Sequence, residues 1–163
     1  MKRPHDELLP PLEQFQAALA GEVAGRERDW AEQVRRALAQ VQEALQRHAA
    51  DTAATAGPFA EVDLTRPSLV RQVGELRREH AEFLEHAASL QKELAHAALA
   101  FQRPADAATP AGGLPAPAPV PAVADFSAIR HRGEQLAAAL QEHRGREAGL
   151  VIESVTTDIG AGD

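Results

Sequence analysis

The chain has 163 residues, a formal net charge of −7 at pH 7 and no cysteine. This length suits a single domain with a buried core, and the negative charge argues against a nucleic-acid partner, because phosphate binding needs a concentrated basic surface. Without cysteine, any metal ion must be held by imidazole and carboxylate groups. Aromatic residues make up only 4% of the chain, and the abundance of Ala, Leu, Glu, Gln and Arg predicts an all-α fold.

The first predicted helix covers about residues 6–22. Its apolar residues recur at the three- and four-residue spacing of one helix face: Leu8, Leu12, Phe15 and Leu19. His5 lies in phase with them. Because Pro10 and Pro11 are tolerated only in a first helical turn, an alternative is that the helix begins as late as Leu9 and leaves His5 on a turn before it.

The second predicted helix covers about residues 28–52 and has one apolar face. This face consists of Trp30, Val34, Leu38, Val41, Leu45, His48 and Thr52. His48 takes a position that an apolar residue would otherwise occupy. Gly57, Pro58 and Pro67 interrupt the helical period after this segment, so we expect residues 53–66 to form a loop that closes one end of a bundle.

The third predicted helix covers about residues 67–101 and is the longest. Steps of four and three recur along its apolar face: Leu69, Val73, Leu76, His80, Phe83, Ala87, Leu90, Leu94 and Phe101. His80 again replaces an apolar residue. The Pro/Ala-rich segment 103–123 has no helical period, and we expect it to be an extended connector that crosses the end of the bundle.

The fourth predicted helix covers about residues 125–153. Its buried face contains two polar residues among the apolar ones: Phe126, Ile129, Gly133, Leu136, Leu140, His143, Glu147 and Leu150. Glu147 follows His143 by four residues, so imidazole and carboxylate lie one turn apart on the same side, a spacing suited to a shared metal ion. The last residues, TTDIGAGD, are expected to cap or pack against the bundle rather than form a fifth helix.

We expect the four helices to form an antiparallel up-down bundle, which brings one histidine of each helix to a common level. These histidines are His5, His48, His80 and His143. With a rise of about 1.5 Å per residue, their depths along the helices agree within roughly 8 Å. Burying polar groups costs about 1–3 kcal/mol each unless they find partners, so a shared ion would explain their placement. His86, His96 and His131 fall between the buried positions and are expected on solvent-exposed faces.

These histidines occur in characteristic sequence motifs. His80 lies in LRREHAEFLEH, His143 and Glu147 lie in LQEHRGRE, and His5 and His48 lie on the two preceding helices. In this pattern, which covers most of the chain, the protein resembles the hemerythrin-like, HHE cation-binding family. The segments HAADTAATAGPFAEV and TTDIGAGD also resemble bacterial members of that family. The resemblance implies a four-helix bundle that holds two irons.

The candidate ligands depart from the family pattern at two positions. The family's second helix normally supplies a carboxylate four residues after its histidine, where this chain has Thr52, with Asp51 as the candidate substitute. Fuller members have a second histidine on the third helix, where this chain has Leu84. Because bridging carboxylates hold two cations together, the resemblance here implies iron in a mononuclear or incomplete di-iron site, with zinc as an alternative. The candidate ligands are His5, His48, His80, His143 and Glu147.

Two functions remain open from the sequence. The first is a hemerythrin-like protein that binds or senses oxygen, nitric oxide or iron. The second, favoured by Thr52 in place of a carboxylate, is a metal-free bundle with a structural or interaction role. No enzyme is expected, because the chain has neither a cysteine nucleophile nor a Gly-rich phosphate loop or GxSxG turn. The charged start MKRPHDELLPPLE and the lack of a segment near the roughly 20 apolar residues that span a bilayer predict a cytoplasmic protein without a membrane partner.

Overall fold

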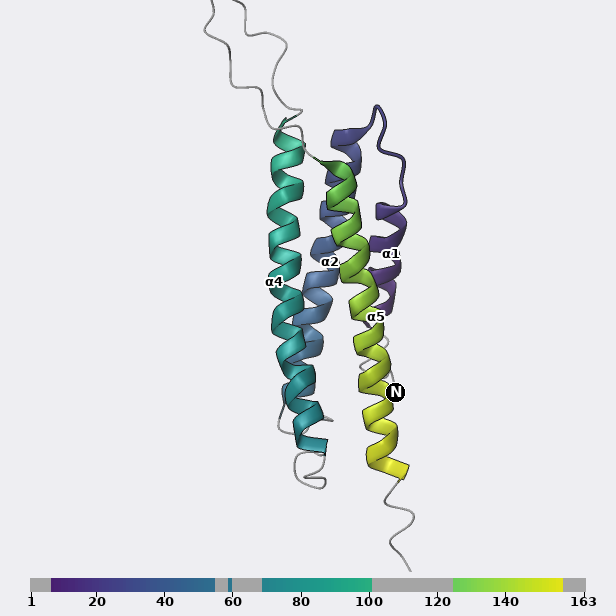
Figure 1. Cartoon of the computed structure of the whole chain (residues 1–163), viewed down its shortest axis with the longest axis vertical. Coiled ribbons are helices and arrows are strands. Elements are labelled where there is room, and N and C mark those ends of the chain that lie inside the picture. The colour runs from purple at the N-terminus through teal and green to yellow at the C-terminus, as the bar shows by residue number, and fades with distance from the viewer. Residues whose placement is uncertain (1–6, 55–58, 60–68, 101–124, 157–163) are drawn as a thin grey trace, which may run out of the picture.

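The computed structural model describes residues 7–54, 59, 69–100 and 125–156. Four helices account for most of these residues: α1 (Leu9–Leu19), α2 (Glu27–Ala53), α4 (Val70–Ala100) and α5 (Phe126–Thr156). The helices lie side by side along the long axis of the molecule (Figure 1). The described ranges contain no strand, so the predicted all-α class is confirmed for them. None of the helices described is both long enough and apolar enough to cross a membrane.

Each helix packs against neighbours on two sides, because α2 contacts α1 and α4, and α5 also contacts α1 and α4. The contacts between α4 and α5 define how these two helices are aligned. Glu79, near the start of α4, lies beside His143 in the second half of α5, whereas Glu93 lies beside Arg132 in the first half. Low residue numbers on α4 therefore face high residue numbers on α5, and the two helices lie alongside each other in Figure 1.

Local sequence signals set the helix bounds, which differ from the predicted ranges by about one turn or less. Proline lies in the first turn of α1, which begins at Leu9, the later of the two expected starts. Gly25 has a φ of 74°, a conformation that residues with a Cβ rarely adopt, and it lies in the turn before α2. The Asp125 carboxylate accepts a hydrogen bond from the backbone N–H of Ala128 at 2.9 Å and caps the start of α5.

Several predicted features lie outside the described residues. These are His5, the connector 103–123, most of the loop 53–66 and nearly all of the TTDIGAGD ending. Phe59 is the one described position between residues 55 and 68. The predictions made for the other segments, and for a single domain over the whole chain, therefore stay predictions.

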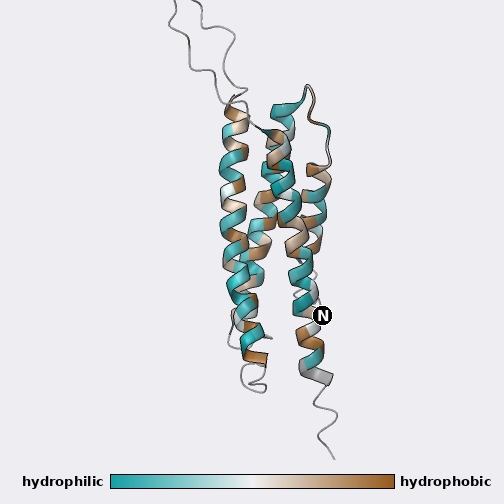
Figure 2. Cartoon of the chain, in the orientation of Figure 1, coloured by the Kyte–Doolittle hydropathy of each residue, from teal (hydrophilic) through white to brown (hydrophobic). Residues whose placement is uncertain are grey.

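The predicted apolar faces form the main core, a cluster of buried residues to which all four helices contribute. Figure 2 shows the corresponding pattern, in which hydrophobic and hydrophilic residues alternate along every helix. Gly133, which occupies a buried position of α5, lets this helix approach α1 closely. A Cβ at this position would lie 2.6 Å from Cδ2 of Leu19, so a larger residue would force the two helices or this side chain to move.

A second, smaller apolar cluster consists of Phe59, Leu69, Val73, Leu76 and Leu150. On α4, His80 separates Leu76 of this cluster from Phe83 of the main core. His143 and Glu147 hold the equivalent place on α5 and are also buried. A layer of polar side chains therefore crosses the bundle between two apolar regions, and this layer contains the candidate site.

Candidate metal centre

Four buried polar side chains converge in this layer: His48 of α2, His80 of α4, and His143 and Glu147 of α5. Each offers one ligand atom, and these atoms all lie within 4.8 Å of one another. His80, the most exposed of the four, has an exposed fraction of only 4%. We call these four residues the buried cluster. All four are among the candidate ligands predicted from the sequence, and the fifth candidate, His5, lies outside the described residues.

The Glu147 carboxylate links the imidazole rings of the buried cluster. Its Oε2 lies 2.8 Å from Nε2 of His48, and its Oε1 lies 3.1 Å from Nε2 of His80. Nε2 of His143 lies 2.8 Å from Nε2 of His80 and 3.2 Å from Oε1 of Glu147. All three rings thus turn the same nitrogen toward one small space. Since imidazole and carboxylate ligands lie about 2.0–2.2 Å from a bound ion such as zinc, the spacing suits a single ion after small shifts.

Two phenylalanine rings flank this space. Phe59 stacks on His80 with ring centroids 6.3 Å apart and an interplanar angle of 15°, and Phe83 meets His143 edge-on at 5.3 Å and 85°. Both phenylalanines are buried, although the sequence pattern placed Phe59 in a loop. Apolar walls exclude water and strengthen the attraction between a bound cation and the Glu147 carboxylate.

A second carboxylate lies on the far side of the His143 ring. Oε2 of Glu79 lies 2.7 Å from Nδ1 of His143. Arg146 donates two hydrogen bonds to the same carboxylate, both at 2.6 Å. Because an ionised carboxylate can only accept hydrogen bonds, Nδ1 of His143 carries a hydrogen and donates it to Glu79. In the neutral ring, Nε2 is then free of hydrogen and turned toward the buried cluster.

The surrounding charges shift the pKa values of His143 and Glu79. Burial lowers the pKa of His143, but hydrogen bonds and charge attraction from Glu147 and Glu79 outweigh it, so this pKa is raised above its ordinary value of 6.5. Burial raises the pKa of Glu79, but Arg146 and His143 outweigh it, so the pKa of this carboxyl is lowered below 4.5. The buried carboxylate of Glu147 therefore favours a positive charge beside it, which either a proton on His143 or a metal ion can supply.

The departures from the family pattern have a structural counterpart. The Thr52 hydroxyl donates to the backbone carbonyls of His48 at 3.0 Å and Ala49 at 3.1 Å, within its own helix. Asp51, the candidate substitute, is exposed and does not belong to the buried cluster. Leu84 packs against the main core. In the part of the chain that the structure describes, the buried cluster thus contains one carboxylate.

The histidines that were given no role, His86, His96 and His131, are all exposed. Glu79 and Arg146 were not predicted as site residues, because neither lies on an apolar face. Both flank those faces, at positions where opposite charges of neighbouring helices pair in coiled coils. A search for such charge pairs next to the buried histidines would have found them.

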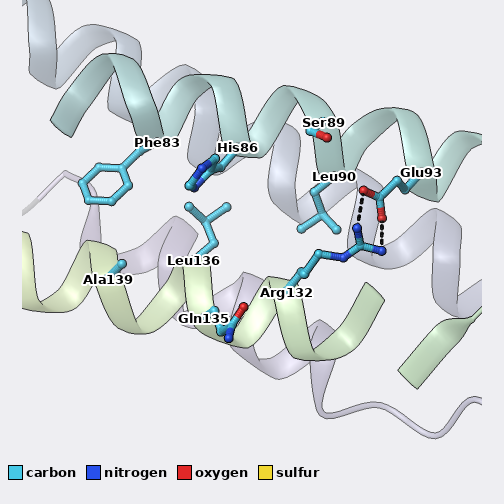
Figure 3. Close-up of a pocket in the computed structure, with 9 residues that line it drawn as sticks. All are labelled: Phe83, His86, Ser89, Leu90, Glu93, Arg132, Gln135, Leu136 and Ala139. Carbon is cyan, nitrogen blue, oxygen red and sulfur yellow. Dashed lines mark hydrogen bonds and ion pairs between the residues drawn. The ribbon is translucent and has the colours of Figure 1, made fainter. Parts of the chain in front are cut away.

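A cavity of about 380 Å³ lies between α4 and α5, along the contact of these two helices, which we call the seam. The ion pair between Glu93 and Arg132 lies at one end of it, and Phe83 and Ala139 lie at the other (Figure 3). Phe83 also contacts His143. The cavity therefore extends along the seam to a side chain that covers the buried cluster.

Comparisons of the chain with models of known families, with curated proteins and with solved structures found no match. The function therefore has to be inferred from the site itself.

Proposed function

We propose that the protein is a hemerythrin-like metal-binding protein that holds one divalent ion, iron in the first place, in the buried cluster. The convergence of three imidazoles and one carboxylate, with ligand atoms within 4.8 Å of one another, carries this proposal. Such a set of nitrogen and oxygen donors suits iron(II) and also zinc(II). When bound, iron would supply a coordination position for a small ligand such as oxygen or nitric oxide.

A mononuclear site is favoured over a di-iron site. Two adjacent cations need several carboxylates to compensate their charge, and Glu147 is the one carboxylate of the buried cluster. Thr52 makes its hydrogen bonds within α2, which leaves no second carboxylate at the family position. His5 remains a proposed additional ligand on the strength of its sequence position alone.

The hemerythrin-like assignment also includes an antiparallel up-down order of the helices. The pairing of Glu79 with His143 and of Glu93 with Arg132 supports this order for α4 and α5. Two contacts support the same order for α2 and α4. Gln91 of α4 donates a hydrogen bond to the backbone oxygen of Arg35, and the ring of His80 contacts that of His48.

The cavity between α4 and α5 is the proposed route for a small ligand. Phe83 lines this cavity and also contacts the His143 ring. Phe83→Ala should therefore speed the binding of nitric oxide to the iron(II)-loaded protein, as measured by stopped-flow absorbance. Leu90→Ala, which enlarges the same cavity further from His143, is the matched control. Equal rates in both variants would contradict this route.

The alternative function, a metal-free bundle with a structural or interaction role, is favoured by one observation. His48 and His80 already lie within hydrogen-bond distance of the Glu147 carboxylate, so the layer can satisfy its polar groups without an ion. We propose no enzymatic activity for either alternative, since the described site offers ligands but no activated nucleophile beside a base.

Metal analysis of the purified protein distinguishes the two functions. We expect about one iron per chain, and stoichiometric uptake of iron(II) or zinc(II) by the metal-free protein near neutral pH. His143→Gln should abolish this uptake, whereas His96→Gln, at an exposed position, should leave it unchanged. If the unaltered protein takes up no metal, the metal-free bundle is the function to retain.

A further inference from the structure

The Glu79–Arg146 ion pair stands out among the polar contacts between α4 and α5, because it continues inward to a buried imidazole. Glu79 uses both carboxylate oxygens toward Arg146, and its Oε2 also lies 2.7 Å from Nδ1 of His143. The side chain of Glu79 is 21% exposed and that of Arg146 is 46% exposed. A chain of contacts therefore runs from the surface of the bundle to the buried cluster.

We propose that Glu79 is a positioning residue for the metal site, and that Arg146 holds it in place. The inference rests on the proposed function, since it assigns to Glu79 the orientation of a metal ligand. Glu79 fixes the hydrogen of the His143 ring on Nδ1, so that Nε2 presents its lone pair to an ion.

The hydrogen-bond pattern distinguishes His143 from the other two imidazoles. His48 contacts the Glu147 carboxylate through Nε2 at 2.8 Å, and His80 does so at 3.1 Å. In the absence of an ion, these nitrogens must carry hydrogens to bond with a carboxylate. Both rings must therefore lose a proton from Nε2 before they bind a metal. His143 differs because Glu79 accepts a hydrogen bond from its Nδ1, so that once the ring is neutral its Nε2 is the nitrogen without a hydrogen and can bind a metal.

Glu79 also changes how strongly His143 binds a cation. A carboxylate that accepts the second N–H of a metal-bound imidazole makes the ring a better donor and fixes its orientation. Arg146 keeps this carboxylate from rotating toward solvent, because its two parallel hydrogen bonds define the plane of the carboxylate. The negative charge of Glu79 lies outside the buried cluster and is matched by Arg146, so it assists His143 without adding an unpaired charge to the interior.

The chain offers a matched control for this inference. Glu93 forms an ion pair with Arg132 across the same two helices, with contacts of 2.8 and 2.5 Å. This pair lies beside the apolar cavity shown in Figure 3 and not beside the buried cluster. Substitutions of Glu93 therefore remove the same type of bond between α4 and α5 without touching a candidate ligand.

The experiment compares zinc affinity in four variants with that of the unaltered protein, by competition with a chelator. Glu79→Ala, which removes both the charge and the hydrogen bond, should weaken zinc binding about 10- to 100-fold. Glu79→Gln, which keeps an acceptor for Nδ1 but loses the charge, should have a smaller effect. Glu93→Ala and Glu93→Gln should stay within about threefold of the unaltered protein, because exposed ion pairs contribute little by themselves.

A second measurement reports orientation directly. Nitrogen-15 NMR of the neutral histidine rings in the zinc-free protein should show a single Nδ1–H form of His143 in the unaltered protein and in Glu93→Ala. In Glu79→Ala, the zinc-free protein should show both tautomers. Arg146→Gln, which leaves Glu79 in place, should give an intermediate loss of affinity, and it serves as a second test if Glu79→Ala fails to fold by circular dichroism.

The outcomes separate this inference from the proposed function. If the unaltered protein binds zinc and Glu79→Ala binds it equally well, Glu79 does not position the ligand, although the metal site stands. Equal losses in Glu79→Ala and Glu93→Ala would also overturn the inference, since they would reflect only the packing of α4 against α5. If the unaltered protein binds no zinc, the proposed function fails and the positioning role falls with it.

Discussion

Two ion pairs of the same kind connect α4 and α5, but different groups lie beside them in the interior of the bundle. Glu79 and Glu93 are 14 residues apart on α4, and their partners Arg132 and Arg146 are 14 residues apart on α5. The two pairs thus occupy equivalent positions, two heptads apart. Beside one lies an apolar cavity, and beside the other lies the buried ring of His143.

This difference indicates that the effect of a charge pair depends on the buried groups that it contacts. A partly exposed ion pair alone stabilises a protein by about 0–1 kcal/mol, because water and salt screen it. The Glu79 pair has a larger expected effect because its carboxylate also fixes a buried donor, Nδ1 of His143, that would otherwise lack this partner. The main core should therefore contribute most of the free energy of unfolding, and the polar layer should contribute most of the metal affinity.

The largest expected effect on stability comes from the apolar region. Leu94 is fully buried in the main core, and Leu94→Ala should lower the free energy of unfolding by about 2–5 kcal/mol. Urea denaturation measures this change. Leu99→Ala, at a position that is 58% exposed, is the control and should change stability by less than about 0.5 kcal/mol. Zinc affinity should be unchanged in folded Leu94→Ala, and its loss would show that the two regions are not independent.

The next effect concerns binding by the polar layer. Glu147→Gln should weaken iron(II) and zinc(II) binding by about 100-fold, or about 2.7 kcal/mol, because it removes the negative charge that neutral imidazoles cannot supply. His5→Gln should weaken binding less, because it removes a neutral imidazole and no negative charge. Titration of both metal-free variants measures the difference. Equal affinities would mean that Glu147 is not a ligand.

A smaller effect should appear in the pH dependence of the metal-free protein. The pKa of His143 is raised above 6.5 in the folded state, so its contribution to stability is fully present below pH 6.5 and is lost as the pH rises through the raised value. The melting temperature in the presence of a chelator should therefore fall as the pH rises above 6.5. His143→Gln should remove this fall, whereas Leu94→Ala should keep it. An unchanged fall in His143→Gln would assign it to other groups.

The polar layer was predictable from the sequence to the extent that it lies on the helical period. His48, His80 and His143 occupy positions that the period assigns to apolar residues, and Glu147 follows from its spacing. Their meeting in one layer depends mainly on helix length and rise, which the sequence defines well. Ligand positions on regular helices could therefore be inferred without coordinates.

The residues around this layer were less predictable. The contact of Glu79 with His143 depends on the rotation of α4 relative to α5, which no spacing within one helix reports. Phe59 is buried against His80, although its neighbours Gly57 and Pro58 indicate a loop and no helical period marks it as core. Thr52, at the position where the family resemblance implies a carboxylate, bonds to its own helix. The contact of Glu79 and the burial of Phe59 depend on tertiary packing, whereas the bond of Thr52 is local to α2.

The smallest expected effect concerns the predicted connector 103–123, which lies in the sequence between the end of α4 at Ala100 and the start of α5 at Phe126. Removing five or six of its residues should change the free energy of unfolding by less than about 0.6 kcal/mol, because loop-closure entropy depends only weakly on length. Some 25 residues separate Ala100 from Phe126, and the roughly 19 that remain can span about 60 Å when extended. Adjacent helices are only about 8–10 Å apart, so the shortened segment is still long enough.

Urea denaturation and zinc titration of the shortened protein test this prediction together. Both the free energy of unfolding and the zinc affinity should match those of the full chain, because we expect an extended connector to add few contacts to the bundle. A decrease of several kcal/mol in the free energy of unfolding, with unchanged zinc affinity, would show that the connector packs against the bundle near Glu93 and Arg132. In that case, the connector would cover the Glu93–Arg132 ion pair. The two ion pairs would then differ in their exposure to solvent as well as in the interior groups beside them.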